Sequence, residues 1–549
     1  MTALVELATG TDAAGEPLDD SANAARHAIA LAREHRPEVM TLERKHDLSL
    51  AALDNVREAT LALYGVIVDV MESKWPDRWR DVRPCLLTAA SWVGYDFDGR
   101  SDVGWIDTFH KRLKDQAACL QTVRAEVDAI CAMAENESES EGIRASLSDL
   151  AALIGQDPAT VRERVREIAP QVVDGAARRL SDPGSGLGHH PQRALESAEA
   201  QPVGRRLFAL RAVLNNSGLG MARVHVRLNA SQLHNALRAT VGLDHPPDDP
   251  RYRVSYLDRP NALLDRVEPV SINFGSILSE PASATRLFMV VAQMLKHIDP
   301  VTPVRFLIFE CEIAFTVLAA LHLARQFGVD DRIDISPLFE TQRALEAGSR
   351  LIDQLLDNPH YRAYVVARGR LSVETGYSDA GRYIGQIPVA ASIERFRSRL
   401  SAVLRKHDLN DVQLMIFDTH GESVGRRAHP AGFPDRLDCV NMRATRRAFA
   451  EAGVDLKEEV SFQGGDGYLH FGTPDAALAT PAGGDAKFAD DPFHAEADYI
   501  REAFTTITEF QRDLMNDGDY TALLGPLRLR SCIPPAAAPW CASAREARP

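Results

Sequence analysis

Two kinds of hydrophobic pattern alternate along this chain of 549 residues. In residues 48–75 and 105–133, apolar positions recur mostly at three- and four-residue steps, which predicts long amphipathic helices. Further along, the short apolar runs 304–309, 332–338 and 412–417 alternate with amphipathic helical segments. Strands that alternate with helices of this length imply right-handed crossovers and a parallel sheet, surrounded here by additional helices.

The composition is that of a globular protein, with 45% hydrophobic and 25% charged residues. A formal net charge of −15 disfavours a general affinity for nucleic acid, because counterion release needs clustered Lys and Arg. Local arginines can still attract a small anionic substrate. The most apolar stretch, 306–323, is interrupted by Glu310 and Glu312, and the amino terminus shows no secretion signal. We therefore expect a cytoplasmic protein with no membrane or nucleic-acid partner.

Polar side chains follow several of the strand-like runs. Glu340 ends the run IDISPLFE, Asp379 lies in TGYSDAGR, and Arg426 lies in FDTHGESVGRR. Residues 221–228 alternate apolar side chains with basic ones, so this strand has a basic face that includes Arg227. Two carboxylates with arginines suit a hard cation and a phosphate-bearing anion. Each residue alone indicates little, since an acidic residue after a strand is more often a helix N-cap or a solvated loop residue.

Six blocks of sequence, in the same order, resemble segments of the phosphoenolpyruvate carboxylase family. GYSDAGRYIG at 376–385 resembles that family's GYSDSxKDAG, and PLFET at 337–341 is identical to its PLFET. Residues 417–430 align without a gap to FHGRGGSxGRGGxP. The segments 460–475, 218–228 and 91–100 resemble VTEQGExxxxxxGxPE, GLHLxxLDIRQ and SWxGGDRDGN. The chain is identified as a divergent member of the bacterial type of this family, shortened at both ends.

The resemblance implies a fold and a division of the chain. The fold is α/β, a TIM-type (β/α)8 barrel embedded in many helices, and mostly α overall. Residues 1–180 are expected to form a helical region that includes SWVGYDFDGR, followed by a flexible connector at 181–203. The barrel core spans 204–480, a helical segment 481–524, and a low-complexity tail 525–549. The family usually forms homotetramers.

The resemblance also implies a reaction. Enzymes of this family convert phosphoenolpyruvate and bicarbonate to oxaloacetate and phosphate with Mg²⁺ or Mn²⁺, a carbon-fixing step that feeds oxaloacetate metabolism and the tricarboxylic acid cycle. Bicarbonate attacks the phosphoryl group, giving carboxyphosphate and the enolate of pyruvate, which then captures CO₂. By position, Glu340 and Asp379 match the two metal ligands. Two carboxylates, with water and substrate completing the shell, suit magnesium.

Four further residues match positions that contact the substrate. Arg227 and Arg426 match arginines that bind its phosphate or carboxylate, a task suited to a planar guanidinium. Arg382 stands where the family has lysine, so the charge is kept but the shape is not. Trp92 lies in the segment that lines the apolar side of the pocket and would shelter the enolate from water.

The departures from the family pattern bear on activity. His420 replaces the first arginine of the glycine-rich loop, where Glu422 also replaces a glycine, and Phe97 replaces an arginine of the 91–100 block. The family's TAHPTE motif, whose histidine accepts a proton from carboxyphosphate, has no match in residues 1–549. We keep His420 as a candidate catalytic residue and expect impaired carboxylation. The alternative is a non-catalytic paralogue that binds phosphoenolpyruvate or a related anionic metabolite.

One segment fits a different class of function. Residues 146–168 read as a helix, a turn at Gly155 and a second helix with three arginines, which resembles a DNA-binding helix-turn-helix. The other interpretation is a helical hairpin on the outside of the barrel. Net acidity and the small number of basic residues favour the hairpin.

Overall fold

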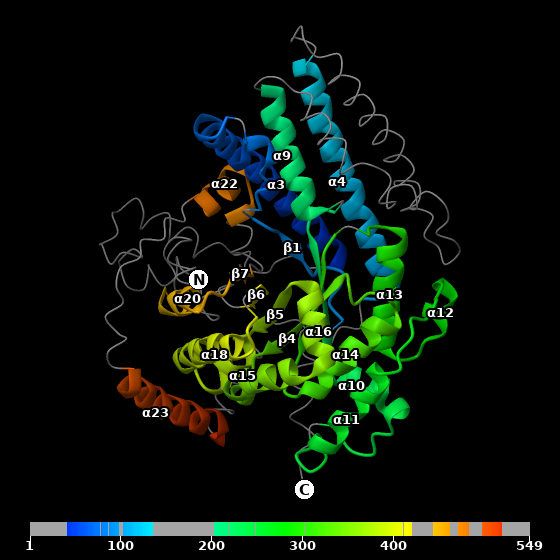
Figure 1. The fold of residues 1–549 in the computed structure, drawn as a ribbon, viewed down its shortest axis with the longest axis vertical. Coiled ribbons are helices and arrows are strands. Elements are labelled where there is room, and N and C mark those ends of the chain that lie inside the picture. The colour runs from blue at the N-terminus through cyan, green and yellow to red at the C-terminus, as the bar shows by residue number, and fades with distance from the viewer. Residues whose placement is uncertain are drawn as a thin grey trace.

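The computed structural model describes residues 41–97, 103–134, 202–419, 443–461, 470–482 and 497–518, apart from positions 77, 86, 219, 248, 301 and 410. Seven parallel strands form one sheet in sequence order: β1 (Ala90–Ser91), β2 (Arg223–Asn229), β3 (Val304–Phe309), β4 (Ile333–Phe339), β5 (Arg370–Thr375), β6 (Gln413–Asp418) and β7 (Leu456–Val460). Around this sheet lie the helices shown in Figure 1. They are α3 (Leu42–Lys74), α4 (Trp105–Ala134), α9 (Pro202–Ser217), α10 (Ala230–Val241), α11 (Arg253–Leu264), α12 (Phe274–Ser279), α13 (Ser283–His297), α14 (Ala314–Gln326), α15 (Gln342–Asp357), α16 (Pro359–Arg368), α17 (Ser378–Tyr383), α18 (Gln386–Lys406), α20 (Arg443–Glu451), α22 (Pro474–Ala482) and α23 (Ala497–Asn516), with a short 3-10 turn at Trp79–Asp81.

The sheet is strongly curled. Neighbouring strands lie about 4.8 Å apart, so four spacings would separate β3 from β7 by about 19 Å in a flat sheet. Instead, Nη2 of Arg305 in β3 donates a hydrogen bond of 3.2 Å to Glu459 in β7. Similarly, the rings of His225 in β2 and Phe417 in β6 lie with centroids 5.0 Å apart. Side chains on the inner face therefore meet across the curl, which fits the expected α/β barrel class.

Alternation along each strand separates an inner face from an outer one. In β3, Phe306 and Ile308 join the large apolar core between the sheet and its covering helices. Arg305 and Leu307 face the inside of the curl, where Arg305 meets Glu459. Because successive side chains point to opposite faces, a buried strand can carry charged residues inward while its outer face stays apolar.

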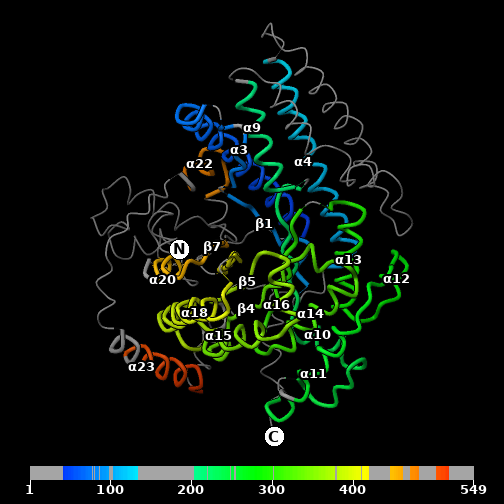
Figure 2. The backbone as a smooth tube through the Cα atoms, in the orientation of Figure 1, coloured from blue at the N-terminus to red at the C-terminus, as the bar shows by residue number. Residues whose placement is uncertain are grey.

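A second layer of helices stands at one end of the molecule. Helices α3, α4 and α9 lie side by side there and share a separate apolar cluster that includes Val68, Val127 and Phe208 (Figure 1). The late helix α22 packs against the early helix α3, although they are far apart in sequence (Figure 2). Asn55 of α3 donates a 2.8 Å hydrogen bond to the carbonyl of Phe471, which precedes α22. None of the described helices is long and apolar enough to span a membrane.

The predicted elements are confirmed with small shifts at their ends. The strand predicted at 304–309 is β3, and those predicted at 332–338 and 412–417 are β4 and β6, each displaced by one residue. The helix predicted at 48–75 begins earlier, at Leu42, because the side chain of Thr41 caps it by accepting a 3.1 Å hydrogen bond from the Arg44 amide. The segment 146–168 lies outside the described residues.

A buried ion pair ties β6 to the helix that covers it. Asp418, at the end of β6, accepts hydrogen bonds from Arg397 of α18 and from Thr375 of β5. The side chains of Arg397 and Asp418 are 2% and 0% exposed. Removing one partner of such a pair leaves the other charge buried and uncompensated, which is far more costly than losing a surface pair.

We therefore expect Asp418→Asn to lower the free energy of unfolding by about 3–5 kcal/mol. The matched control is Asp128→Asn, which removes an exposed pair with Arg124 on α4 and should cost less than about 1 kcal/mol. Urea unfolding followed by circular dichroism measures both. Equal midpoints for the two variants would show that the buried pair has no special weight.

Candidate active site

The two acidic motifs meet at the carboxyl ends of β4 and β5. These strands pair in parallel, with Leu338 opposite Glu374. The amide of Gly376 donates a 3.0 Å hydrogen bond to the carbonyl of Phe339, and the amide of Ala380 donates one of 3.1 Å to the carbonyl of Glu340. PLFET and GYSDA are therefore joined through their backbones, because parallel strands end at the same edge of a sheet.

Glu340 is held at this edge, with 5% of its surface exposed. A Cβ on Gly376 would lie 2.7 Å from the Cβ of Glu340 and 3.1 Å from Leu338, so only glycine leaves room for the glutamate. Asp379 and Arg382 lie on α17, which begins three residues after β5, but their side chains are outside what the structure describes. The backbone thus brings the two predicted metal ligands to adjacent strand ends.

The opening of the curled sheet at the carboxyl ends of its strands, where Glu340 lies, is called the mouth here. Arg227 lies at this mouth between two aromatic faces. Its guanidinium carbon is 4.2 Å from the ring centroid of Phe309 and 5.4 Å from that of Trp92. Its Nη1 lies 3.5 Å from a carboxylate oxygen of Asp96. Cation–π contacts hold the guanidinium plane without using its N–H donors, and its buried Nε has no hydrogen-bond partner among the described residues. These donors suit an anionic ligand.

The walls beside Arg227 are apolar. One cluster forms them, with Trp92 packed against its buried members Leu307, Phe309, Leu338 and Phe417. Trp92 follows β1, and the parallel bridge between Asp96 and Arg227 fixes its segment against β2. Such a lining excludes water and strengthens electrostatic interactions within the mouth.

The segment that carries Trp92 and Asp96 is anchored by the outer helices. Tyr95 donates a 3.2 Å hydrogen bond from its hydroxyl to Asp115 of α4, which also lies 2.7 Å from Nε2 of His46 on α3. Thr108 donates a 2.8 Å hydrogen bond to the carbonyl of Gly94. These contacts are buried, so the helices that precede the sheet set the position of one wall of the mouth.

A charged layer lies deeper inside the curl. Burial raises the pKa of Glu459, but the positive charge of Arg305 outweighs it and lowers this pKa to about 2. Burial also lowers the pKa of His225 to about 3, and the charge of Arg305 adds to the shift. Near neutral pH the layer is thus an ion pair beside a neutral imidazole, so His225 is a poor acceptor of protons.

Sequence reasoning missed Glu374, the inward residue of β5 just before the GYSDA motif. It is completely buried, and neither carboxyl oxygen has a hydrogen-bond partner among the described residues. Burial raises its pKa to about 8; the charge of Arg227 opposes the shift and that of Glu340 adds to it. The alternation in RLSVET is the signal that could have revealed it, since it places Glu374 on the same face as Ser372 and Gly376.

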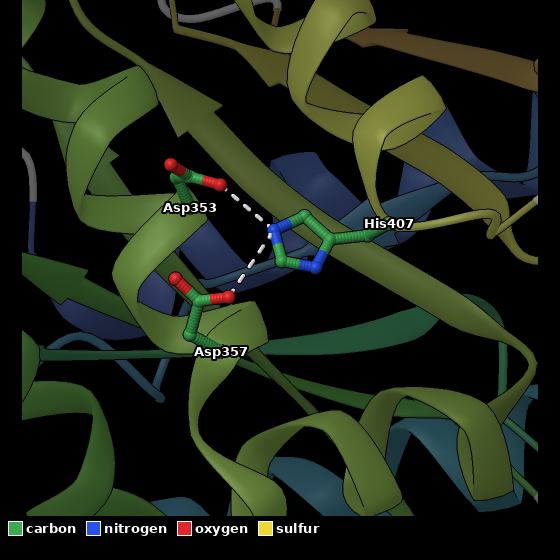
Figure 3. Close-up of side chains that lie close together, drawn as sticks. All are labelled: Asp353, Asp357 and His407. Atoms are coloured by element: carbon green, nitrogen blue, oxygen red, sulfur yellow. Dashed lines mark hydrogen bonds and ion pairs between the residues drawn. The ribbon is translucent and has the colours of Figure 1, made fainter.

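The other predicted residues of the site, His420 and Arg426, lie outside the described residues. A different His–carboxylate cluster, formed by Asp353, Asp357 and His407, lies on the covering helices and is drawn in Figure 3. Nε2 of His407 is 2.7 Å from Asp353 and 4.0 Å from Asp357. Lys406 already pairs with the same two carboxylates, at 2.7 and 3.9 Å, so the cluster is neutralised as an ion-pair network.

Comparisons with known proteins point to one family. The family profile described as "Phosphoenolpyruvate carboxylase" matches residues 190–432, which hold β2–β6 and both acidic motifs. Over this region the chain is similar to the phosphoenolpyruvate carboxylase family. It is 24% identical to the phosphoenolpyruvate carboxylase of Nocardia farcinica over 455 residues, which cover 72% of this chain and 48% of that protein.

Two other phosphoenolpyruvate carboxylases match shorter stretches of the chain. The protein of Xanthomonas euvesicatoria is 29% identical over 373 residues, covering 62% of this chain and 40% of its own. That of Hahella chejuensis is 38% identical over 115 residues, which cover 21% of this chain and 12% of that protein. The chain thus matches less than half the length of each of these relatives.

The close approach of Gly376 and Glu340 gives a prediction for the site. Gly376→Ala should displace Glu340, weaken Mn²⁺ binding and cost about 1–3 kcal/mol of stability, because the new methyl overlaps the glutamate. Gly381→Ala is the control in the same motif, since its Cβ would meet nothing closer than 3.8 Å. Calorimetry with Mn²⁺ and thermal unfolding measure both effects. Normal Mn²⁺ affinity in Gly376→Ala would show that this close approach does not hold Glu340.

Glu374 should make stability depend on pH in metal-free buffer. Its pKa is about 8 in the folded protein against an ordinary value of 4.5, so the folded state holds the proton more tightly. The free energy of unfolding should therefore fall as the pH rises from about 4.5 to 8. Glu374→Gln cannot titrate and should lose less stability over this range, by on the order of a few kcal/mol. Urea midpoints at several pH values in chelator test this, and parallel curves would contradict it.

Proposed function

We propose that this chain binds phosphoenolpyruvate together with Mg²⁺ or Mn²⁺ and carries out phosphoenolpyruvate carboxylase-type chemistry with bicarbonate. The observation that carries the proposal is the hydrogen bond between the Ala380 amide and the Glu340 carbonyl. It joins the two acidic motifs of the family at one edge of the sheet, next to Arg227 and its aromatic walls. Among the described residues, no second place combines two acidic motifs with an arginine between aromatic side chains.

Glu340 and Asp379 would hold the divalent cation. The fit is supported by the buried carboxyl of Glu340 and by the space over Gly376 that a Cβ would fill. Two carboxylate ligands with open positions for water and phosphate are what magnesium sites of this kind use. When bound, the cation supplies positive charge that stabilises phosphoryl oxygens and a developing enolate oxygen.

The arginines would bind and orient the anion. Arg227 presents donors at the mouth while Phe309 and Trp92 hold its plane, and Arg382 and Arg426 would add charge from α17 and from the segment after β6. Trp92 and Leu338 would keep water from the enolate. His420 would be the candidate for proton transfer in that segment.

We also propose that the seven strands belong to an eight-stranded (β/α)8 barrel. The sequential parallel order and the contacts across the curl support it, since such barrels are built from consecutive parallel strands. The active site of such a barrel lies at the carboxyl ends of the strands, where Glu340 and Arg227 lie. A cytoplasmic homo-oligomer with a role in oxaloacetate metabolism stays a prediction.

A second candidate function is binding of phosphoenolpyruvate or a related anion without catalysis. Phe97 favours it: this residue packs partly buried against the apolar core, at a position where the family pattern has an arginine. The site would then keep its metal pair and Arg227 but have less positive charge for catalysis. Product formation separates the two candidates.

Substrate binding should depend on the shape of Arg227 as well as on its charge. In Mn²⁺ buffer, Arg227→Lys should weaken phosphoenolpyruvate binding by about 1–3 kcal/mol, because lysine cannot reproduce the guanidinium geometry. Arg223→Lys is the matched control, since Arg223 begins the same strand and donates to the carbonyl of Asn216. Isothermal calorimetry measures both. Equal affinities for the two variants would remove Arg227 from the proposed site.

The chain should bind phosphoenolpyruvate but convert it to oxaloacetate only slowly. No residue of the sequence matches the family's proton-accepting histidine, and general acid–base help is worth about 10²–10⁴-fold. We expect metal-dependent binding with slow oxaloacetate formation, measured by a coupled assay, and a separate assay for released phosphate. Binding without either product would favour the non-catalytic candidate. Rapid carboxylation would show that another group, such as His420, takes the proton.

A further inference from the structure

Glu374 occupies an unusual position for a carboxyl group. On one side of β5 it lies opposite Leu338 of β4, and on the other side opposite Phe417 of β6. Both of these residues belong to the apolar lining. The residue is 0% exposed, and both carboxyl oxygens lack hydrogen-bond partners among the described residues. Leaving a buried polar group unpaired costs about 1–3 kcal/mol, and an apolar side chain of similar size would avoid that cost.

The charges around Glu374 come from both signs. Arg227 and Arg305 attract its carboxylate, whereas Glu340 and Asp96 repel it. Arg305 already has Glu459 as its hydrogen-bonded partner, and Arg227 makes its polar contact with Asp96. Neither arginine therefore serves as the missing partner of Glu374 in this structure. Several carboxylates converging on one region suit a cation better than they suit one another.

Backbone geometry places Glu374 on the same inner face of the sheet as Glu340. Residues 374 and 376 lie on the same face of the chain, about 7 Å apart at two residues along a strand. The side chain of Glu340 occupies the space over Gly376, with its Oε2 3.4 Å from where a Cβ would stand. A glutamate side chain can span much of that separation, so the two carboxyl groups can share one ion between them.

We propose that Glu374 is a further carboxylate ligand, together with Glu340, of the divalent cation bound at the mouth of the sheet. This inference rests on the proposed function in that Glu340 belongs to the metal site. It assigns a third acidic side chain that the family motifs do not include. The ion supplies the partner that the Glu374 oxygens lack, and hard divalent cations favour several carboxylate oxygens. The added negative charge also makes the site more selective for a divalent cation over a monovalent one.

Mn²⁺ binding to the chain of 549 residues tests the proposal, measured by calorimetry and by water-proton relaxation without substrate. Glu374→Gln should weaken Mn²⁺ binding on the order of 10–100-fold, because it removes one anionic ligand but keeps the side-chain shape. Glu374→Met should do the same, and its apolar side chain suits the surrounding lining. The control is Glu310→Gln, since Glu310 follows β3, is exposed and bonds Asn229 at 3.0 Å. Its affinity should not change.

Glu340→Gln separates this inference from the proposed function. Weak binding in both Glu340→Gln and Glu374→Gln, with folded circular dichroism spectra, supports the shared site. Wild-type affinity in both Glu374 variants overturns the inference and leaves the metal pair of the proposed function intact. Wild-type affinity in Glu340→Gln overturns both, as does a parent protein that does not bind Mn²⁺. If Glu374→Gln does not fold, the Glu374→Met result decides in the same way.

Discussion

The parallel ladder from β2 to β6 is the constraint on which the rest of the molecule depends. Each strand pairs with the next one in sequence, so all carboxyl ends reach the same edge of the sheet. The curl then turns that edge into a mouth, as the contact between His225 and Phe417 across four strand spacings demonstrates. Motifs separated by more than a hundred residues, such as those of Arg227 and Glu340, become neighbours for this reason.

Polarity is arranged differently on the two faces of the sheet. Outside the curl, apolar residues meet the helices, and the buried ion pair between Arg397 and Asp418 fixes α18 on β6. Inside the curl lie charged groups: Arg305 is hydrogen-bonded to Glu459, and the charges of Arg227 and Arg305 both act on Glu374. Buried charges in a region of low dielectric make each ionisation depend on its neighbours.

The helical layer contributes to the mouth from a distance. Asp115 and His46 belong to α4 and α3, yet their hydrogen bonds determine where Tyr95 lies, and with it the segment that carries Trp92. Helices outside the sheet therefore act as a second support for the site. Their buried hydrogen bonds fix the position of one wall of the mouth.

The sequence by itself determined the local structure and the resemblance to one family. Periodicity placed β3 and α4 almost to the residue, because burial of one face leaves a repeating apolar pattern. The motif blocks identified Glu340, Asp379 and Arg227 as candidates. The tertiary structure alone decided which residues meet. It also revealed Glu374, because the curl of the sheet from β2 to β6 encloses this side chain among described residues that offer its carboxyl oxygens no hydrogen bond. A linear pattern records which face a side chain takes, but it holds no information on what lies across the sheet.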